Sequence, residues 1–188
     1  HPDRILTIAT SPLRGQVATG STNGSIYLWS VEGQPLATLE GHRGWVLALD
    51  YAPSGETLAS SGSDGTIQLW RVSDGKRQRI QIIPTGQGWV YEVHFSPDGQ
   101  RLVSRGRDGT IKLWDLNGKL LTQFTGHQGA IYAVKFSPNG QLLATRGRDS
   151  TVRLWDLNGK PLAGLRNHQG EIYDMAFLPS GDEVVTAG

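Results

Sequence analysis

The sequence predicts an all-β fold in which units of four short antiparallel strands follow one another along the chain. Three observations predict it: tryptophans recur at a nearly constant spacing, strand and turn signals alternate in the same order in every unit, and no segment shows a convincing helical period. The recurring tryptophans are separated by 41, 44 and 41 residues and are Trp29, Trp70, Trp114 and Trp155.

The order of elements is clearest in the fourth unit, where β-rich segments alternate with turns of glycine, asparagine, aspartate and proline. The expected strands are 130–136, 142–146, 151–156 and 161–165, and the turns between them are 137–141, 147–150 and 157–160. Four short strands in every 41–44 residues are typical of a propeller blade. A blade does not bury both of its faces alone, so its neighbours must supply the core.

The predicted repeats cover about 1–41, 42–85, 86–126, 127–167 and, in part, 168–188. They open at His1, His42, Gly86, His127 and His168. The last repeat has only its first two strands, which predicts an open or partial ring of four blades and half of a fifth. Because open strand edges pair readily with other strands, we expect the rest of a longer chain, or further copies of this one, to complete the ring.

Two dipeptides recur at fixed places in these units: Gly-His at 41–42 and 126–127, and Trp-Asp at 114–115 and 155–156. With the repeat spacing, they make the whole chain resemble the WD40 repeat family of β-propellers. The resemblance implies a protein-interaction scaffold without chemistry of its own. The strong similarity between units is also seen in propellers attached to bacterial signalling NTPases or kinases, so a sensor segment of such a protein is the alternative.

The resemblance implies a buried tetrad in each blade, in which the opening histidine bonds an aspartate and a hydroxyl, and the hydroxyl accepts the tryptophan N–H. Linking these groups matters because each one buried without a partner costs about 1–3 kcal/mol. The complete sets are His42, Ser60, Asp64 and Trp70 in the second unit, and His127, Thr145, Asp149 and Trp155 in the fourth.

Two units depart from this pattern. The first has His1, Thr19 and Trp29 but Asn23 in place of the aspartate, and the third has Ser104, Asp108 and Trp114 but Gly86 in place of the histidine. We expect the neighbouring Gln87 to reach the third tetrad only if its loop shifts. Blades one and three should therefore be the softer ones.

Serine, histidine and aspartate also form hydrolase triads, but the pattern argues against catalysis here. A triad is normally built once, whereas this set recurs about every 40 residues, and threonine replaces serine freely. The sequence signals neither an oxyanion hole nor a substrate cleft. We therefore predict no enzyme activity, no cofactor and no metal site.

Tyrosines and arginines recur at two other positions. In the WD40 family these positions lie on the narrower face, around the central channel, so the resemblance implies a partner-binding patch formed by Tyr91, Tyr132, Tyr173, Arg107 and Arg148. Tyrosine and arginine are enriched at binding hot spots. Packing of the tyrosines against the inner strands, and solvation or ion pairing of the arginines, remain alternatives. Arg105 and Arg146 are candidates for bracing the blade, and both packing and groove roles are open for Trp45 and Trp89.

Composition narrows the class of partner. The chain of 188 residues has 18 basic and 17 acidic residues, a net charge of +1, and no cysteine. This balance argues against nucleic acid, and an acidic or phosphorylated peptide fits a few arginines better. The sequence contains no apolar run of about 20 residues that would span a membrane. Because cysteine is absent, a reducing compartment is compatible, and we expect a cytoplasmic protein.

Overall fold

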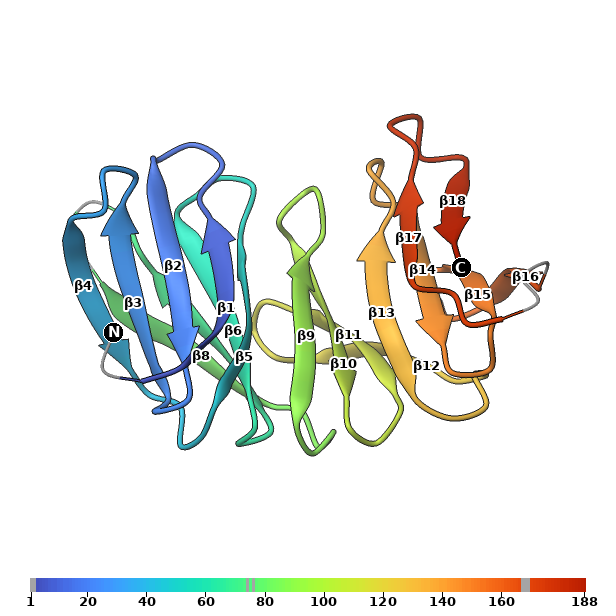
Figure 1. Ribbon diagram of the computed structural model, residues 1–188, viewed down its shortest axis with the longest axis horizontal. Helices are drawn as coiled ribbons and strands as arrows, with labels where there is room; N and C mark the ends of the chain where they lie inside the picture. Colours follow the sequence, from blue (N-terminus) through green and yellow to red (C-terminus); the bar gives the residue numbers. More distant parts are fainter. Residues whose placement is uncertain (1–2, 74, 76, 167–169) are drawn as a thin grey trace.

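The computed structural model describes residues 3–73, 75, 77–166 and 170–188, and every regular element in these ranges is a β-strand. Four sheets have four antiparallel strands each and a fifth has two, which confirms the predicted fold class (Figure 1). No helix in the described ranges is long and apolar enough to cross a membrane.

Each sheet takes its strands in chain order from the inner to the outer edge. The first blade contains β1 (Ile5–Thr10), β2 (Gln16–Ser21), β3 (Ser25–Ser30) and β4 (Pro35–Glu40). The second contains β5 (Val46–Tyr51), β6 (Thr57–Gly62), β7 (Thr66–Arg71) and β8 (Gln78–Pro84). The third contains β9 (Val90–Phe95), β10 (Arg101–Gly106), β11 (Ile111–Asp115) and β12 (Leu120–Phe124). The fourth contains β13 (Ile131–Phe136), β14 (Leu142–Gly147), β15 (Val152–Asp156) and β16 (Pro161–Leu165). The two-stranded sheet contains β17 (Asp174–Phe177) and β18 (Val184–Ala187).

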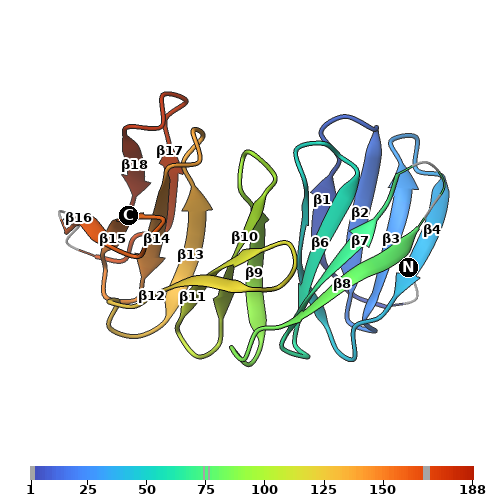
Figure 2. The same ribbon diagram turned by 180° about the vertical axis from the view of Figure 1, so that it is seen from behind.

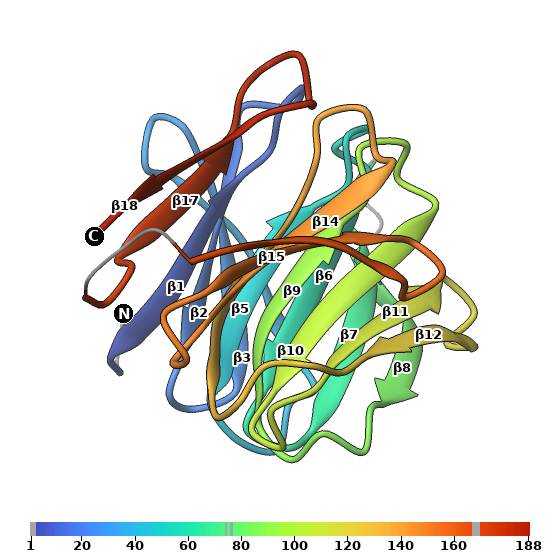
Figure 3. The ribbon, with the colours of Figure 1, turned by 90° about the vertical axis from the view of Figure 1, so that its right-hand side faces the viewer.

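The blades stand in a row with their inner and outer strands on opposite sides. Inner strands β9 and β13 face the viewer in Figure 1, and outer strands β8 and β12 cross the front in Figure 2. In Figure 3 the sheet of β17 and β18 stands in front, at the end of the row. No strand pairing joins this sheet to β1–β4 within the described part of the chain, so the ring is open there.

The apolar core lies between neighbouring blades, as expected for blades that have two apolar faces. Ile26 and Leu28 of the first blade pack with Val46 and Leu58 of the second, and all four are fully buried. Equivalent clusters lie at the following blade boundaries. Each blade is therefore stabilised mainly by its neighbours.

Polar side chains also cross the blade boundaries. On the inner side, Asp50 Oδ2 of β5 accepts the N–H of Phe95 at 2.7 Å, and Glu92 Oε2 of β9 accepts the N–H of Val134 at 3.1 Å. On the outer side, Gln81 Nε2 of β8 donates to the carbonyl of Asn117 at 2.6 Å. These bonds fix the angle between successive blades at both edges.

One of the turns between the second and third strands lacks the glycine that the equivalent turns contain. The turns between the second and third strands carry glycine with positive φ at Gly24, Gly65 and Gly109. The fourth blade has Ser150 at the same place, with φ of 54°. A side chain in this left-handed conformation is strained, because its Cβ approaches the backbone.

Candidate functional site

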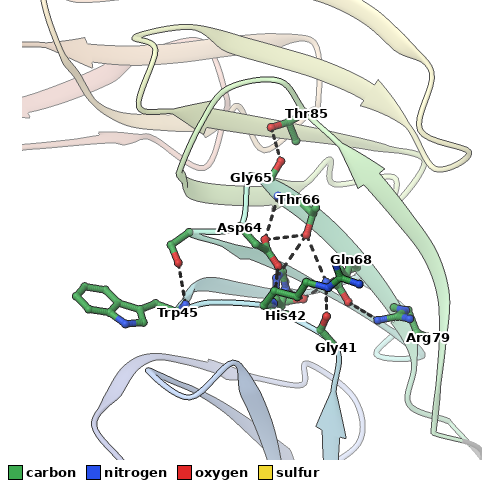
Figure 4. A network of polar contacts seen from close by, with 12 residues as sticks. Gly41, His42, Trp45, Asp64, Gly65, Thr66, Gln68, Arg79 and Thr85 are labelled. Atoms are coloured by element: carbon green, nitrogen blue, oxygen red, sulfur yellow. Dashed lines mark hydrogen bonds and ion pairs between the residues drawn. The ribbon is translucent and has the colours of Figure 1, made fainter.

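The second blade contains a continuous polar chain between its inner strands and the turn that follows β6 (Figure 4). His42 Nδ1 lies 2.9 Å from Asp64 Oδ2, and His42 Nε2 lies 2.7 Å from Ser60 Oγ. The Trp70 indole N–H donates to the same Ser60 oxygen at 2.8 Å. The structure thus brings together the four residues expected from the sequence, and Ser60 is fully buried.

The fourth blade repeats this arrangement with threonine in place of serine. His127 lies 2.9 Å from Asp149 and 2.8 Å from Thr145, and Trp155 donates to Thr145 at 2.8 Å. Asp149 also accepts the N–H of Gln128 at 3.0 Å. This additional bond attaches the loop that enters the blade to its second turn.

The electrostatics of the fourth blade favour a neutral His127 beside an ionised Asp149. Burial lowers the pKa of His127 and outweighs the opposing effect of Asp149. Burial alone would raise the pKa of Asp149, but hydrogen bonds from Thr151, Gln128 and His127 hold it well below the ordinary value. The same kind of balance, with His42 as the main opposing partner, lowers the pKa of Asp64. The His127 imidazole therefore donates through Nδ1–H to Asp149 and accepts the Thr145 hydroxyl proton at Nε2.

In the third blade, Gln87 takes the place of the histidine in the polar network, although the expected position is Gly86. Gln87 is fully buried, and its Oε1 accepts the hydroxyl of Ser104 at 2.5 Å, while Trp114 donates to Ser104 at 2.9 Å. Gln87 Nε2 donates to the carbonyl of Thr110 at 2.9 Å. Asp108 bonds Thr110 and makes no side-chain contact with Gln87 among the described hydrogen bonds.

The sequence placed Gly86 at the histidine position and expected Gln87 to reach the tetrad only if the loop shifts. In the structure Gln87 does reach Ser104. Gly86 and Gly88 both have φ of 67°, on either side of Gln87. Glycine adopts this conformation without the strain of a side chain, and Gln87 between the two glycines is fully buried. An amide therefore replaces the imidazole as the partner of the hydroxyl.

In the first blade, the described residues form only part of the hydrogen-bonded tetrad. Trp29 donates to Thr19 at 2.9 Å. Asn23 instead donates to Asp3 at 2.9 Å and to the Tyr27 hydroxyl at 3.1 Å. His1 lies outside the described residues, as does His168.

These polar chains lack the geometry of a nucleophilic site. Ser60, Ser104 and Thr145 are fully buried and each accepts a tryptophan N–H. A substrate carbonyl cannot approach a hydroxyl that is enclosed in this way. In the ranges that the structure describes, no cluster of three histidine, cysteine, aspartate or glutamate side chains is placed to hold a metal ion.

Three of the five predicted partner-binding residues meet at the boundary between blades three and four. Tyr91, Arg107 and Tyr132 line a groove of about 340 Å³, which we call the tyrosine–arginine groove. Arg107 is exposed and Tyr132 is 37% exposed. Arg148 and Tyr173 do not line this groove; both are exposed, Tyr173 by 70%.

Arg105 and Arg146 brace neighbouring blades. Arg105 Nη1 donates to the carbonyl of Ile131 at 2.8 Å, and Arg146 Nη1 donates to that of Ile172 at 2.5 Å. Each guanidinium also lies over the tyrosine of its own blade, at 5.1 Å from the centre of the Tyr91 ring for Arg105 and at 5.3 Å from that of Tyr132 for Arg146. The tyrosines are thereby held in place at the edge of the groove.

Trp45 and Trp89 extend this surface toward the second blade. Their ring centroids are 5.6 Å apart, and those of Trp89 and Tyr91 are 6.3 Å apart. The guanidinium of Arg107 lies 5.6 Å from the centre of the Trp89 ring. Packing between blades accounts for half-buried Trp89, whereas Trp45 remains 45% exposed.

Sequence reasoning missed a larger hollow at the opposite end of the inner strands. It measures about 550 Å³, and its lining includes Asp50, His94, Lys135, Phe136 and Phe177. The signal was present, because Asp50, His94 and Lys135 occupy one position in successive units, immediately before an aromatic residue. Burial raises the pKa of Asp50 despite its bond from the Phe95 N–H.

Comparison with known proteins identifies the repeat. The family profile described as "WD domain, G-beta repeat" matches residues 1–30, 33–71, 77–115, 118–156 and 159–188. Each of the three central matches begins with the outer strand of one blade and continues through the first three strands of the next. One repeat of the family therefore joins two neighbouring blades covalently.

Curated relatives match over shorter stretches. The chain is 44% identical over 59 residues to nuclear distribution protein PAC1-2 of Uncinocarpus reesii (strain UAMH 1704), which covers 31% of this chain and 13% of that protein. It is 39% identical over 67 residues to small ribosomal subunit protein RACK1y of Oryza sativa subsp. japonica, covering 35% and 20%. It is 36% identical over 74 residues to DDB1- and CUL4-associated factor 13 of Dictyostelium discoideum, covering 38% and 17%. The matched segments thus span a fifth or less of these relatives.

Proposed function

Because the chain belongs to the WD40 repeat family, whose members are protein-interaction scaffolds, we propose that it binds a protein or peptide partner without catalysing a reaction on it. The binding surface is the tyrosine–arginine groove, together with exposed Arg148 and Tyr173 on the following blades. The convergence of Tyr91, Arg107 and Tyr132 on one groove carries this proposal.

The chemistry of the groove suits an acidic or phosphorylated peptide next to an apolar side chain. Tyrosine rings offer apolar area at little cost in side-chain freedom, and guanidinium groups bind carboxylate or phosphate through paired hydrogen bonds. Bracing by Arg105 preorganises Tyr91, so less ordering is required when a partner binds. The proposed location is the cytoplasm, which the absence of cysteine supports.

The proposal can be tested with peptides selected from a random phage-displayed library against the purified chain. For a selected peptide, Tyr132→Ala and Arg107→Ala should each weaken binding by about 1 kcal/mol or more, as measured by fluorescence anisotropy. Arg148→Ala should weaken binding similarly, because the proposed surface includes Arg148. The control is Asn158→Ala, in the turn at the opposite end of β15. Loss of binding in the control, with normal binding by Tyr132→Ala and Arg107→Ala, would show that the site is elsewhere.

Completion of the ring is a second part of the proposal. Ile5 and Ile8 of β1 are 48% and 66% exposed, on the sheet that begins the row of blades. Apolar area of this kind is normally covered in a propeller by an adjacent blade. We propose that a further blade covers it, supplied by a longer chain or by another copy.

A further inference from the structure

Trp45, Trp89 and Tyr91 form an aromatic row at the tyrosine–arginine groove, and packing between blades leaves the Trp45 ring largely exposed. Trp45 lies at the end of the row, and its ring points away from the polar network of the second blade (Figure 4). Its backbone is nevertheless fixed, because Trp45 N–H donates to Ser63 Oγ at 2.8 Å and its carbonyl accepts the Ser63 N–H at 2.9 Å. A large ring on a fixed backbone that is left 45% exposed is typical of a contact residue.

The charges around the groove select the kind of anion. Arg105 lies 3.0 Å from Glu92, in an ion pair whose two side chains are mostly buried, so its charge is already compensated. Arg107 makes no ion pair among the described residues, and its guanidinium stacks on Trp89. The groove therefore offers one uncompensated positive charge. A carboxylate matches one charge, whereas a phosphate monoester carries about −1.5 to −2 and is best held by several donors.

We propose that the groove and the Trp45–Trp89 pair form one site for an extended peptide, with a carboxylate on Arg107 and an aliphatic side chain on Trp45. This inference rests on the proposed function and narrows it in two ways. It selects an aspartate or glutamate in place of a phosphorylated residue, and it adds the second blade to the contact surface. Along this site the aromatic rings follow the order Trp45, Trp89 and Tyr91, and the Arg107 guanidinium lies over Trp89 in the middle.

The probes are fluorescein-labelled peptides with one leucine and one aspartate in a glycine–serine background, made at every spacing from adjacent to several residues apart. Each has partners with alanine for leucine, asparagine for aspartate, or phosphoserine for aspartate. Binding is measured by anisotropy to the chain, to Trp45→Ala and to Leu162→Ala. Leu162 is the control because it is 50% exposed on outer strand β16. Circular dichroism checks that all variants remain folded.

At the preferred spacing, Trp45→Ala should weaken binding of the leucine peptide about fivefold or more and leave the alanine peptide unchanged. Asparagine for aspartate should weaken binding about tenfold, and phosphoserine should bind no tighter than aspartate. The inference is overturned if no peptide in the set binds, if phosphoserine binds more tightly, or if Trp45→Ala and Leu162→Ala have the same effect. If Tyr132→Ala still weakens a phage-selected peptide in any of these cases, the proposed function survives without the inference.

Discussion

Asp108 and Asp149 offer a matched pair for testing whether the polar chains stabilise the fold. Both follow the same Arg-Gly-Arg sequence and occupy the same turn in neighbouring blades. Their surroundings differ. The side chain of Asp149 is bonded to the histidine of its blade, whereas the carboxylate of Asp108 bonds only the turn residue Thr110 among the described contacts. We expect Asp149→Ala to destabilise the chain much more than Asp108→Ala.

The loss in free energy of unfolding depends on the hydrogen-bond donors that each substitution leaves without an acceptor. Asp149 accepts from buried His127 at 2.9 Å and from Thr151 at 2.7 Å, and only 12% of its side chain is exposed. Leaving one buried N–H unpaired and losing a second charge-assisted bond should lower the free energy of unfolding by about 2–4 kcal/mol. Asp108 is exposed, and water can replace it as the acceptor for Thr110. Its loss should therefore cost about 0.5–1 kcal/mol.

Urea unfolding followed by tryptophan fluorescence and by far-ultraviolet circular dichroism measures both free energies. The two probes should give the same midpoint if unfolding is two-state, and the slope with urea should be unchanged in the variants. Asn23→Ala, in the first blade, should also cost less than Asp149→Ala. Equal losses for Asp108→Ala and Asp149→Ala would refute the reasoning, because the histidine bond would then contribute nothing.

Two further predictions concern the fourth blade. The stability contributed by neutral His127 is fully present above its usual pKa of 6.5, and it is lost as the pH falls through the lower pKa of the folded state. The stability contributed by ionised Asp149 is lost at lower pH, below its usual pKa of 3.8. Urea unfolding at a series of pH values should therefore show falling stability from neutral pH downward, less steeply in His127→Gln; identical profiles would contradict this. Ser150→Gly should raise the free energy of unfolding by about 1 kcal/mol, because relief of the left-handed conformation exceeds the entropy that glycine adds to the unfolded chain. A thermal melt at or below that of the parent chain would show that Ser150 is not strained.

The fold was predictable from the sequence because its determinants are local and repeated. In the fourth unit the strands expected at 142–146 and 161–165 are found at Leu142–Gly147 and Pro161–Leu165. Glycine and asparagine fix the turns, and the alternation of apolar residues fixes the faces. The residues expected in the second and fourth tetrads came from the resemblance to the WD40 family, and the structure brings them together.

Features that depend on one loop or on one boundary were less accessible to sequence reasoning. Gln87 was a candidate only on the condition of a loop shift, because pattern matching places Gly86 beside Ser104. The shift depends on the backbone conformation of two glycines, which no residue pattern specifies uniquely. The ion pair between Arg105 and Glu92 also escaped prediction, since it joins residues 13 positions apart through the geometry of two strands.

Repetition along the chain does not produce equal sites, because a groove belongs to a blade boundary and not to a blade. The boundary between blades three and four takes Tyr91 and Arg107 from one side and Tyr132 from the other. Rotation to the next boundary would use Tyr132, Arg148 and Tyr173, but Tyr173 stands 70% exposed just before β17.

The third blade is therefore the centre of the proposed site, and it is also the blade whose tetrad lacks a histidine. Both properties come from the loop at 86–89. Left-handed glycines lie on either side of buried Gln87, and Trp89 follows immediately, packed between Trp45 and Tyr91 in tilted and edge-on ring contacts. Replacing Gly88 with a residue that resists positive φ should consequently disturb the buried amide and the aromatic row together. The loop thus couples the stability of the third blade to the shape of its binding surface.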